Sequence, residues 1–445
     1  MLAQHLASLD RAVPRYTSYP TAPHFAAAVD AQQYASWLEI LPASESLSLY
    51  LHVPFCEKLC LYCGCHTKAV RQFAPVEAYA ELLIGELNLV AARTGSCRVS
   101  HLHWGGGTPS ILGPHLLRKL VAELDVHFDL TSLREHAIEL DPRSVTKQLA
   151  EALADIGVTR ASLGVQDLSD RVQSAIGRLQ PFSTVERAVG ILRDAGIERI
   201  NIDLMYGLPS QSVEDVCQTV TRSHELKPQR FAMFGYAHVP WFKPHQKLID
   251  ESALPAQPMR IAQARAAHEI LTGLGYVPIG LDHYADETDS LTNALRVGKL
   301  RRNFQGYTTD DADTLIGLGA SAIGQLSQGY VQNAKDTGSY ARAIKSGRLA
   351  TVRGIALSAD DRMRGRIISE LMCNLTCDLD SFAHDADRTF ESEIDALLPF
   401  VADGLLRIER CRLVVEENGR PYLRLIAAAF DSYLNSSRAR HSVGV

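Results

Sequence analysis

The feature that most constrains this chain is a regular alternation of apolar strand-like and amphipathic helical segments between residues 46 and 237. The strand-like segments are 46–53, 99–106, 135–141, 160–165, 199–207 and 230–237. The segments with apolar residues at helical spacing are 76–94, 116–128, 145–157, 184–197 and 212–227. Ser183 with Glu186 and Ser212 with Asp215 resemble capping boxes. Such an alternation predicts parallel strands with crossover helices, in either an open doubly wound sheet or a barrel.

The regions on either side of this alternation differ from it. Residues 1–45 include PRYTSYPTAP at 14–23, which has no helical or alternating period and predicts an extended arm. Beyond about residue 355 the pattern becomes mainly helical, with two strand-like segments around Glu417–Asn418–Gly419 and a final helix at 428–440. We therefore expect an arm at 1–45, a catalytic domain at 46–355 and a small, winged-helix-like helical cap at 356–445.

Charge and hydropathy exclude several classes of protein. The formal net charge of -6 gives no global attraction to nucleic acid or to anionic membranes. No apolar run approaches the ~20 residues that span a bilayer, and the N-terminus has no secretory signal pattern. We therefore expect a cytoplasmic protein. Four of the nine cysteines fall within ten positions, which indicates a metal or redox site rather than a disulfide framework.

Three of these cysteines, Cys56, Cys60 and Cys63, have the spacing C-x3-C-x2-C and directly follow the strand at 46–53. Three thiolates would leave one iron of a 4Fe–4S cube open. The amino and carboxylate groups of S-adenosylmethionine can chelate that iron, and one electron can then cleave the cofactor's C–S bond. A zinc site that adds Cys65 or His66 is the alternative.

The five other cysteines stand in apolar helical or strand contexts, where buried and inert thiols are expected. They are Cys97, Cys217, Cys373, Cys377 and Cys411.

Polar residues recur where the predicted strands end. HWGGGTPS at 103–110 offers glycines that would let a ligand approach the backbone. Glu139, Gln166, Asp203 and Tyr236–His238 stand toward the carboxyl ends of four different predicted strands. Polar groups on several strand ends indicate one site on the top face of a barrel, which favours the barrel over the open sheet.

These motifs resemble the radical S-adenosylmethionine superfamily, and most closely the oxygen-independent coproporphyrinogen III oxidase family. The resemblance extends over nearly the whole chain: PRYTSYPTAPHF at 14–25, the cysteine loop, HWGGGTP, the segments of Gln166 and Asp203, RNFQGYTT at 302–309, and the cap. It implies an α/β fold, an incomplete parallel (β/α)6-type TIM-like barrel with an N-terminal arm and a small, mainly helical C-terminal domain.

The resemblance also implies the cofactors and their residues. Cys56, Cys60 and Cys63 would bind one 4Fe–4S cluster, whereas Cys65 would not. Two molecules of S-adenosylmethionine would bind. The first would contact Tyr50, Gly106, Glu139 and Ile323. The second would contact Tyr62 (where the family often has Phe), Gly107, Thr108, Gln166, Arg178, Asp203 and Ala237.

The implied reaction is the oxidative decarboxylation of two propionates of coproporphyrinogen III to vinyl groups, which gives protoporphyrinogen IX. We expect a monomer that receives electrons from an unidentified donor. Because the substrate carries four carboxylates and the chain is acidic, Arg15 and Arg302 are candidate substrate residues. The alternatives are a heme-binding chaperone of the same superfamily, and a zinc-stabilised regulator that binds nucleic acid through its cap.

Overall fold

The computed structural model describes residues 12–42, 44–382 and 389–434. Its main sheet has 12 strands in the order β16-β15-β14-β13-β1-β4-β5-β6-β7-β8-β10-β9. The six predicted strands are confirmed and pair in parallel, each with its neighbour along the chain. They are β1 (Ser46–Val53), β4 (Arg98–Gly106), β5 (Glu135–Leu140), β6 (Arg160–Gln166), β7 (Arg199–Tyr206) and β8 (Arg230–Gly235).

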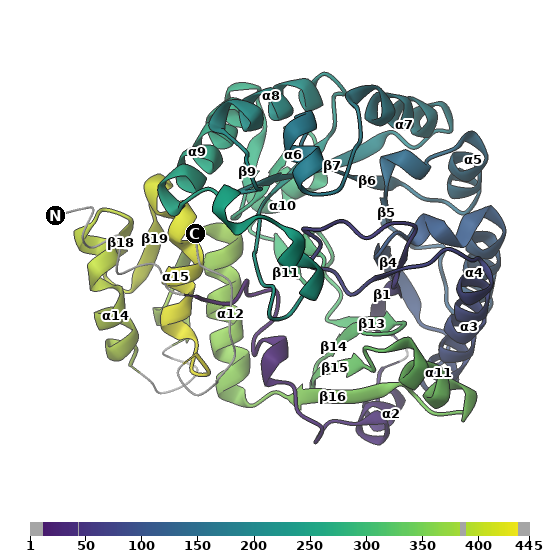
Figure 1. Cartoon of the computed structure of the whole chain (residues 1–445). Helices are drawn as coiled ribbons and strands as arrows, with labels where there is room; N and C mark the ends of the chain where they lie inside the picture. Colours follow the sequence, from purple (N-terminus) through teal and green to yellow (C-terminus); the bar gives the residue numbers. More distant parts are fainter. Residues whose placement is uncertain (1–11, 43, 383–388, 435–445) are drawn as a thin grey trace.

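A seventh parallel strand, β13 (Thr314–Leu318), pairs with β1 and was not predicted. Antiparallel strands continue the sheet beyond both edges of this parallel part. They are β14 (Ile323–Leu326), β15 (Gly329–Asn333) and β16 (Thr351–Ala356) on one side, and β10 (His283–Ala285) and β9 (Val277–Ile279) on the other. Strands β16 and β9 stand at the two ends of the strand order, so the sheet does not close. It curves into an incomplete barrel (Figure 1).

Helices cover the outside of this sheet (Figure 1). The five predicted helices are confirmed as α3 (Ala74–Thr94), α4 (Gly113–His127), α5 (Lys147–Asp155), α7 (Phe182–Asp194) and α8 (Val213–His224). The capping box of Ser212 and Asp215 is present at α8. The one predicted at Ser183 is wrong, because α7 already begins at Phe182 and Pro181 occupies the N-cap. The chain adds α6 (Asp170–Ala175), α9 (Gln257–Gly273), α10 (Ser290–Arg296) and α11 (Thr337–Lys345).

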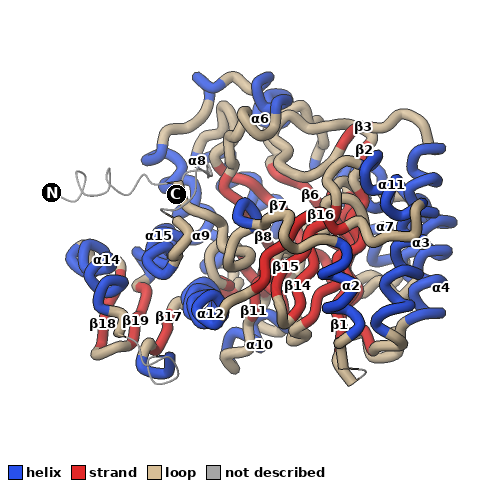
Figure 2. Tube along the Cα trace, turned by 90° about the horizontal axis from the view of Figure 1, so that it is seen from below, coloured by secondary structure: helices blue, strands red, loops and turns tan. Residues whose placement is uncertain are grey.

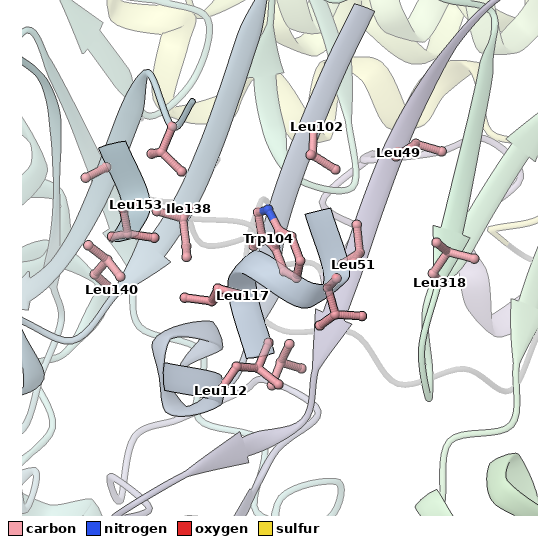
Figure 3. Packing of buried hydrophobic residues seen from close by; sticks show 14 of the residues in the cluster. Leu49, Leu51, Leu102, Trp104, Leu112, Leu117, Ile138, Leu140, Leu153 and Leu318 are labelled. Carbon is pink, nitrogen blue, oxygen red and sulfur yellow. The ribbon is translucent and has the colours of Figure 1, made fainter. Parts of the chain in front are cut away.

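The main core lies between the outer face of the strands and these helices (Figure 3). Trp104 of β4 and Leu51 of β1 pack there against Leu117 of α4, all almost completely buried. Trp104 Nε1 donates a hydrogen bond to His136 Nε2 at 2.8 Å, so that the indole is buried without an unsatisfied donor. Burial of each such side chain contributes roughly 1.5–3 kcal/mol to folding.

The arm contains two elements that were not predicted, a 3-10 helix at Ala22–His24 and helix α2 (Ala31–Glu39). Helix α2 begins at Asp30, whose carboxylate accepts hydrogen bonds from the backbone N–H groups of Gln32 and Gln33. Residues 13–21 have neither helix nor strand, as predicted. This part of the arm packs inside the protein, because Tyr16 and Tyr19 are buried in the core of the C-terminal region.

The C-terminal region contains α12 (Ala359–Asn374), α14 (Glu391–Ala402), α15 (Leu423–Ala427) and a three-stranded sheet. Its strands are β17 (Thr376–Asp378), β18 (Leu406–Glu409) and β19 (Arg412–Val415). The predicted hairpin turn is wrong by several residues: the chain turns at Arg410 with φ 57°, and Glu417–Tyr422 forms a 3-10 helix. The predicted final helix is reduced to a 3-10 turn at Ala428–Phe430, and residues 435–440 lie outside the described residues.

The division into residues 1–45, 46–355 and 356–445 stays a prediction. No helix in the described parts of the chain is long and apolar enough to cross a membrane.

Candidate active site

A cavity of about 710 Å³ opens at the carboxyl ends of the barrel strands. Most of the predicted site residues line it: Arg15, Cys56, Cys60, Tyr62, Cys63, Gly106, Gly107, Thr108, Glu139, Gln166, Arg178, Asp203, Ala237 and Arg302. Tyr50 and Ile323 do not line this cavity. Parallel strands end at the same edge of a barrel, and this common edge brings residues distant in the sequence together.

The cysteine loop is fixed at both ends. Strand β2 (Phe55–Cys56), where the loop begins, pairs with β3 (Lys68–Ala69), which follows the loop. Cys56 Sγ lies 3.2 Å from Thr67 Oγ1 and 3.4 Å from Thr108 Oγ1. Cys60 Sγ accepts a hydrogen bond from Arg178 Nη1 at 3.4 Å. The loop therefore holds its first two thiols against neighbouring donors that would stabilise thiolates.

The third cysteine has a thiol whose pKa is lowered by its surroundings. A hydrogen bond from Cys65, with the nearby charges of Lys243 and Arg178, outweighs burial and lowers the pKa of Cys63 to about 7. The same contact with Cys63 raises the pKa of Cys65 well above its usual range. Of this adjacent pair, Cys63 is the better thiolate ligand, since metals bind the deprotonated form.

The three thiols fit a cluster better than a single ion. Among the described residues, no three His, Cys, Asp or Glu side chains converge closely enough to bind one metal ion. A cube binds each thiolate to a different iron and needs its ligands farther apart than tetrahedral zinc does. Cys56, Cys60 and Cys63 nevertheless line one cavity. Three thiols on one cavity are the donor set that a 4Fe–4S cluster with one open iron needs.

The glycines after β4 are required by the packing of the protein itself. Gly106 has φ 111°, and a Cβ atom there would lie 2.6 Å from the ring of His52. A Cβ atom at Gly107 would collide with the carbonyl oxygen of Phe55. The end of β4 thus packs directly on the strand that leads into the cysteine loop.

Glu139 lies at the end of β5, partly exposed to the cavity. Its Oε2 accepts a hydrogen bond from the N–H of Gly106 at 3.2 Å, and its Oε1 lies 3.4 Å from His103 Nε2. Tyr50 is placed behind this carboxylate, with its ring stacked 5.9 Å from that of His103 and its hydroxyl 3.0 Å from His52 Nδ1. Ile323, at the start of β14, lies on the β13 side of β1.

Asp203 faces the cavity from the middle of β7. Its carboxylate accepts hydrogen bonds from Ser162 Oγ at 3.0 Å and from Asn201 Nδ2 at 2.7 Å. Burial and the charge of Glu139 raise the pKa of Asp203 to about 6. Two carboxylates on one wall, one of them easily protonated, can receive amino or hydroxyl groups of a ligand.

Arg178 reaches the same wall from the loop after α6. Its Nη2 donates to the carbonyl oxygen of Gly164 at 2.6 Å, and its Nη1 lies 3.4 Å from Asp141 Oδ2. Asp141 therefore orients the guanidinium that contacts Cys60. Gln166 ends β6 in the left-handed region with φ 71°. Asp141 was not predicted as a site residue, although it directly follows β5.

The floor of the cavity holds a buried ionic network that was also not predicted. Arg160 Nε donates to Glu135 Oε2 at 3.0 Å, and Arg160 Nη2 donates to Asp289 Oδ2 at 3.1 Å. Arg230 Nε donates to Asp289 Oδ1 at 2.8 Å. Burial opposes ionisation of Glu135, but the charges of Arg230 and Arg160 lower its pKa to about 2. The sequence did contain a signal for this network. Side chains alternate between the two faces of a strand, so Glu135 and Glu139 had to share one face of β5.

Arg15 and Arg302 meet at one side of the cavity. Arg302 belongs to β11 (Arg301–Asn303), which forms a hairpin with β12 (Gly306–Thr308). Arg302 Nη2 lies 3.4 Å from the carbonyl oxygen of Arg15, and Arg15 Nη2 donates to the carbonyl oxygen of Gly235 at 3.1 Å. The arm and RNFQGYTT therefore lie together at the cavity, although 287 positions of the sequence separate Arg15 from Arg302.

Arg302 itself is 5% exposed and stacks 4.5 Å above the ring of Tyr307. Its Nη1 lies 3.9 Å from Asp282 Oδ1. Burial opposes the charge of Asp282, but a hydrogen bond and charge from His283, together with Arg302, lower its pKa to about 2. Within the described chain, Arg302 Nε and Nη1 and Gln305 Nε2 are buried without a hydrogen-bond partner. A ligand that accepts hydrogen bonds would satisfy them.

The open parallel barrel and the three-cysteine loop define a class of protein, and comparison with known families agrees. Residues 50–222 match the family described as the radical SAM superfamily, and residues 357–422 match the HemN C-terminal domain. The chain is therefore a radical S-adenosylmethionine protein that binds a 4Fe–4S cluster and S-adenosylmethionine.

The whole-length relatives define it further. An oxygen-independent coproporphyrinogen III oxidase of Bradyrhizobium diazoefficiens is 48% identical over 97% of each chain. That of Salmonella typhimurium is 37% identical over 95% of this chain and 93% of its own. The solved coproporphyrinogen III oxidase (HemN) of Escherichia coli superposes with a TM-score of 0.89 at 35% identity, over 95% of this chain and 100% of its own. The chain belongs to the family of oxygen-independent coproporphyrinogen III oxidases, which confirms the resemblance of the sequence.

Proposed function

We propose that this protein decarboxylates two propionate side chains of coproporphyrinogen III oxidatively to vinyl groups, and so forms protoporphyrinogen IX in heme biosynthesis. One observation carries the proposal. In a member of this family, the cysteine loop, the strand-end carboxylates and a buried guanidinium with unsatisfied donors all face one cavity.

We assign the cluster to Cys56, Cys60 and Cys63. When bound, the cluster and S-adenosylmethionine would supply a 5′-deoxyadenosyl radical that removes hydrogen from a propionate side chain. Arg178 and Thr108 donate toward the sulfur atoms of Cys60 and Cys56 and would orient these ligands toward the cluster. Cys65 would adjust the acidity of Cys63 without binding iron.

Two S-adenosylmethionine molecules would share the upper wall. We assign Tyr50, Gly106, Glu139 and Ile323 to the first of them. We assign Tyr62, Gly107, Thr108, Gln166, Arg178, Asp203 and Ala237 to the second. The carboxylates of Glu139 and Asp203 would accept hydrogen bonds from polar cofactor groups. Asp203 could do so in its charged form once a ligand donor offsets its burial.

Arg302, with Arg15 beside it, would bind a propionate of the substrate. A guanidinium can bind a carboxylate through charge-assisted hydrogen bonds, and both Arg302 and Arg15 line the cavity. We also infer that the protein acts as a monomer in the cytoplasm and takes electrons from a separate reductant. The location rests on the sequence, which has no secretory signal pattern, and the other two assignments rest on the resemblance to the family.

The test is anaerobic turnover by reconstituted, reduced protein. We expect coproporphyrinogen III to be converted to protoporphyrinogen IX with release of 5′-deoxyadenosine. Heme should not bind tightly to the same preparation. Tight heme binding without decarboxylation would favour the heme-binding chaperone and overturn the proposal.

A further inference from the structure

A short segment that follows β8 is bound to the backbone of the cysteine loop. Lys243 Nζ donates to the carbonyl oxygen of Cys65 at 2.7 Å, and Gln246 Nε2 donates to that of Tyr62 at 2.9 Å. Between them, His245 Nε2 lies 2.8 Å from the carbonyl oxygen of Cys63. Segment 239–246 is thus held against the part of the loop that contains the third cysteine.

The same segment presents two large apolar side chains at the surface. Trp241 is 52% exposed and Phe242 is 56% exposed. Gly64 and Cys65 are exposed to the active-site cavity, which Phe242 also lines, so the cysteine loop lies next to this surface. Neighbouring exposed aromatic residues on a rigid support are typical of protein-binding surfaces.

Cations surround these aromatic residues. Lys243 Nζ and Lys335 Nζ lie 5.0 and 5.9 Å from the ring centroid of Phe242. Burial and the charges of Arg353 and Lys243 lower the pKa of Lys335, so these cations lie close enough to repel one another. Lys68 joins them from β3, since its Nζ donates to Thr337 Oγ1 of α11 at 2.8 Å; Figure 2 shows β2 and β3 beside this helix.

The positive charge of this surface is not neutralised locally. Lys68, Lys243 and Arg353 bond to a hydroxyl, a carbonyl and an amide oxygen, respectively. Asp336, the acid next to Lys335, caps α11 by accepting the N–H of Ser339 at 2.7 Å. Among the described residues, none of the four cations forms an ion pair with a carboxylate. A positive surface therefore stands out on a chain whose net charge is -6.

The anionic substrate does not account for these cations. Phe242 lines the active-site cavity, but Trp241, Lys68, Lys243, Lys335 and Arg353 do not. A porphyrinogen inside the cavity would leave Trp241, Lys68 and Lys335 exposed to solvent, while Lys243 is buried beneath them. The surface is thus suited to something that docks from outside the cavity.

We propose that the aromatic–basic patch, formed by Trp241, Phe242, Lys68, Lys335 and Arg353 over the buried Lys243, docks an acidic protein that carries one electron on a flavin or an iron–sulfur group. The inference rests on the proposed function, which needs an electron at the cluster for each cofactor cleaved. In each encounter the reduced carrier loses one electron and the cluster gains one. Electron transfer weakens steeply with distance, so a carrier must dock on a surface that lies next to the cysteine loop. Opposite charges steer such weak, transient complexes.

The test separates docking from chemistry by using two reductants. Reduced flavodoxin, an acidic flavoprotein, must dock, whereas dithionite is small and need not. We would measure the rate at which each reduces the reconstituted cluster, without porphyrinogen, and the affinity of oxidised flavodoxin by calorimetry. We expect Lys335→Glu and Trp241→Ser to weaken flavodoxin binding and slow its electron transfer by about fivefold or more, or roughly 1 kcal/mol. Reduction by dithionite and iron content should stay within twofold of the parent.

Two matched variants serve as controls. Lys147→Glu makes the same charge change at an exposed lysine of α5, and Val126→Ser removes an exposed apolar residue of α4. Both should behave as the parent with either reductant. The parent's flavodoxin rate should fall with added salt more steeply than that of Lys335→Glu.

Three outcomes would overturn the patch. Unchanged flavodoxin rates in Lys335→Glu and Trp241→Ser would exclude docking there. An equal loss with both reductants would mean that these residues support the cluster instead. A raised KM for coproporphyrinogen under dithionite, with unchanged flavodoxin rates, would assign the charge to the substrate. Because cluster reduction is read without porphyrinogen, failure of the proposed reaction would leave this result interpretable.

Discussion

The two faces of the barrel strands differ in chemistry at neighbouring positions. On β4, Trp104 points outward into the core, whereas His103 lines the cavity. On β6, Leu163 is buried in the core and Ser162 faces the cavity. The outward face gains free energy from apolar burial. The inward face holds charges and hydroxyls whose partial desolvation opposes folding, and it carries the chemistry. Substitutions on the two faces should therefore fail in different ways.

The largest expected effect is on the inward side, at the cysteine loop. Cys56→Ser, Cys60→Ser or Cys63→Ser should abolish the iron–sulfur absorbance and all turnover, because each removes one of three thiolates. The fold should survive, as measured by circular dichroism. Cys65→Ser is the control and should retain iron. Equal iron loss from Cys65→Ser and Cys63→Ser would contradict the three-ligand assignment.

The second effect belongs to the outward face. Trp104→Ala should lower the free energy of unfolding by about 3–5 kcal/mol, because it leaves a cavity and removes the donor to His136. Urea denaturation of the cluster-free protein measures the loss. Once folded below the transition, the variant should bind S-adenosylmethionine like the parent. A stability loss of less than 1 kcal/mol would mean that Trp104 is not part of the rigid core.

The third effect returns to the cavity. Glu139→Gln keeps the shape of the side chain but removes the charge that accepts from Gly106. We expect S-adenosylmethionine affinity to fall by about tenfold to a hundredfold, or roughly 1.5–3 kcal/mol, with little change in stability or iron content. Equilibrium binding under anaerobic conditions measures it. If Glu139→Gln changed the free energy of unfolding more than the free energy of cofactor binding, the proposed difference between the two faces of the strands would be wrong.

The same distinction explains what could be predicted from the sequence. The outward face follows local rules, so apolar segments with helices between them identified six strands to within two residues. Strand β13 was missed because a long stretch of short, irregular elements separates it from β8.

The inward face depends on distant partners. Three strands begin with a charged residue, and a charged side chain at the start of a strand is usually exposed to solvent. These residues are Glu135, Arg160 and Arg230. Only curvature of the sheet brings them together with Asp289, the N-cap of α10. The cysteine loop could be predicted because its ligands are local. Tyr16 and Tyr19, in contrast, gave no signal that the arm packs into the C-terminal core.

The fourth effect is a pH dependence of stability from Asp203. Its pKa in the folded state is about 6, above the ordinary 3.8. Between these values the folded state binds more protons than the unfolded state, so this residue reduces stability as the pH rises through that window. Asp203→Asn should therefore be more stable than the parent at pH 8, by about 1–2 kcal/mol, with a smaller difference at pH 5.

The check is urea denaturation of the cluster-free protein at both pH values. Asp155→Asn, a change at an exposed carboxylate of α5, should show no such pH dependence. A gain from Asp203→Asn that is the same at pH 5 and pH 8 would show that the carboxylate is not held against its ionisation. The result would measure how much stability the protein loses by keeping a charged side chain at this position of the inward face.

The smallest expected effect tests whether an inward charge can be specific in geometry as well as in sign. Arg302→Lys retains the positive charge beside Asp282 but loses the planar fork and its stacking on Tyr307. We expect the KM for coproporphyrinogen to rise about threefold to tenfold, roughly 1 kcal/mol, with kcat and S-adenosylmethionine affinity within twofold. Arg301→Lys, at the neighbouring residue paired with Asp313 on the exposed side, should change none of these values. If both variants kept the parent KM, Arg302 would only join the hairpin to the arm, and the carboxylates of the substrate would be bound elsewhere in the cavity. If only Arg302→Lys raised it, the donors left unsatisfied by the protein would be those that the substrate uses.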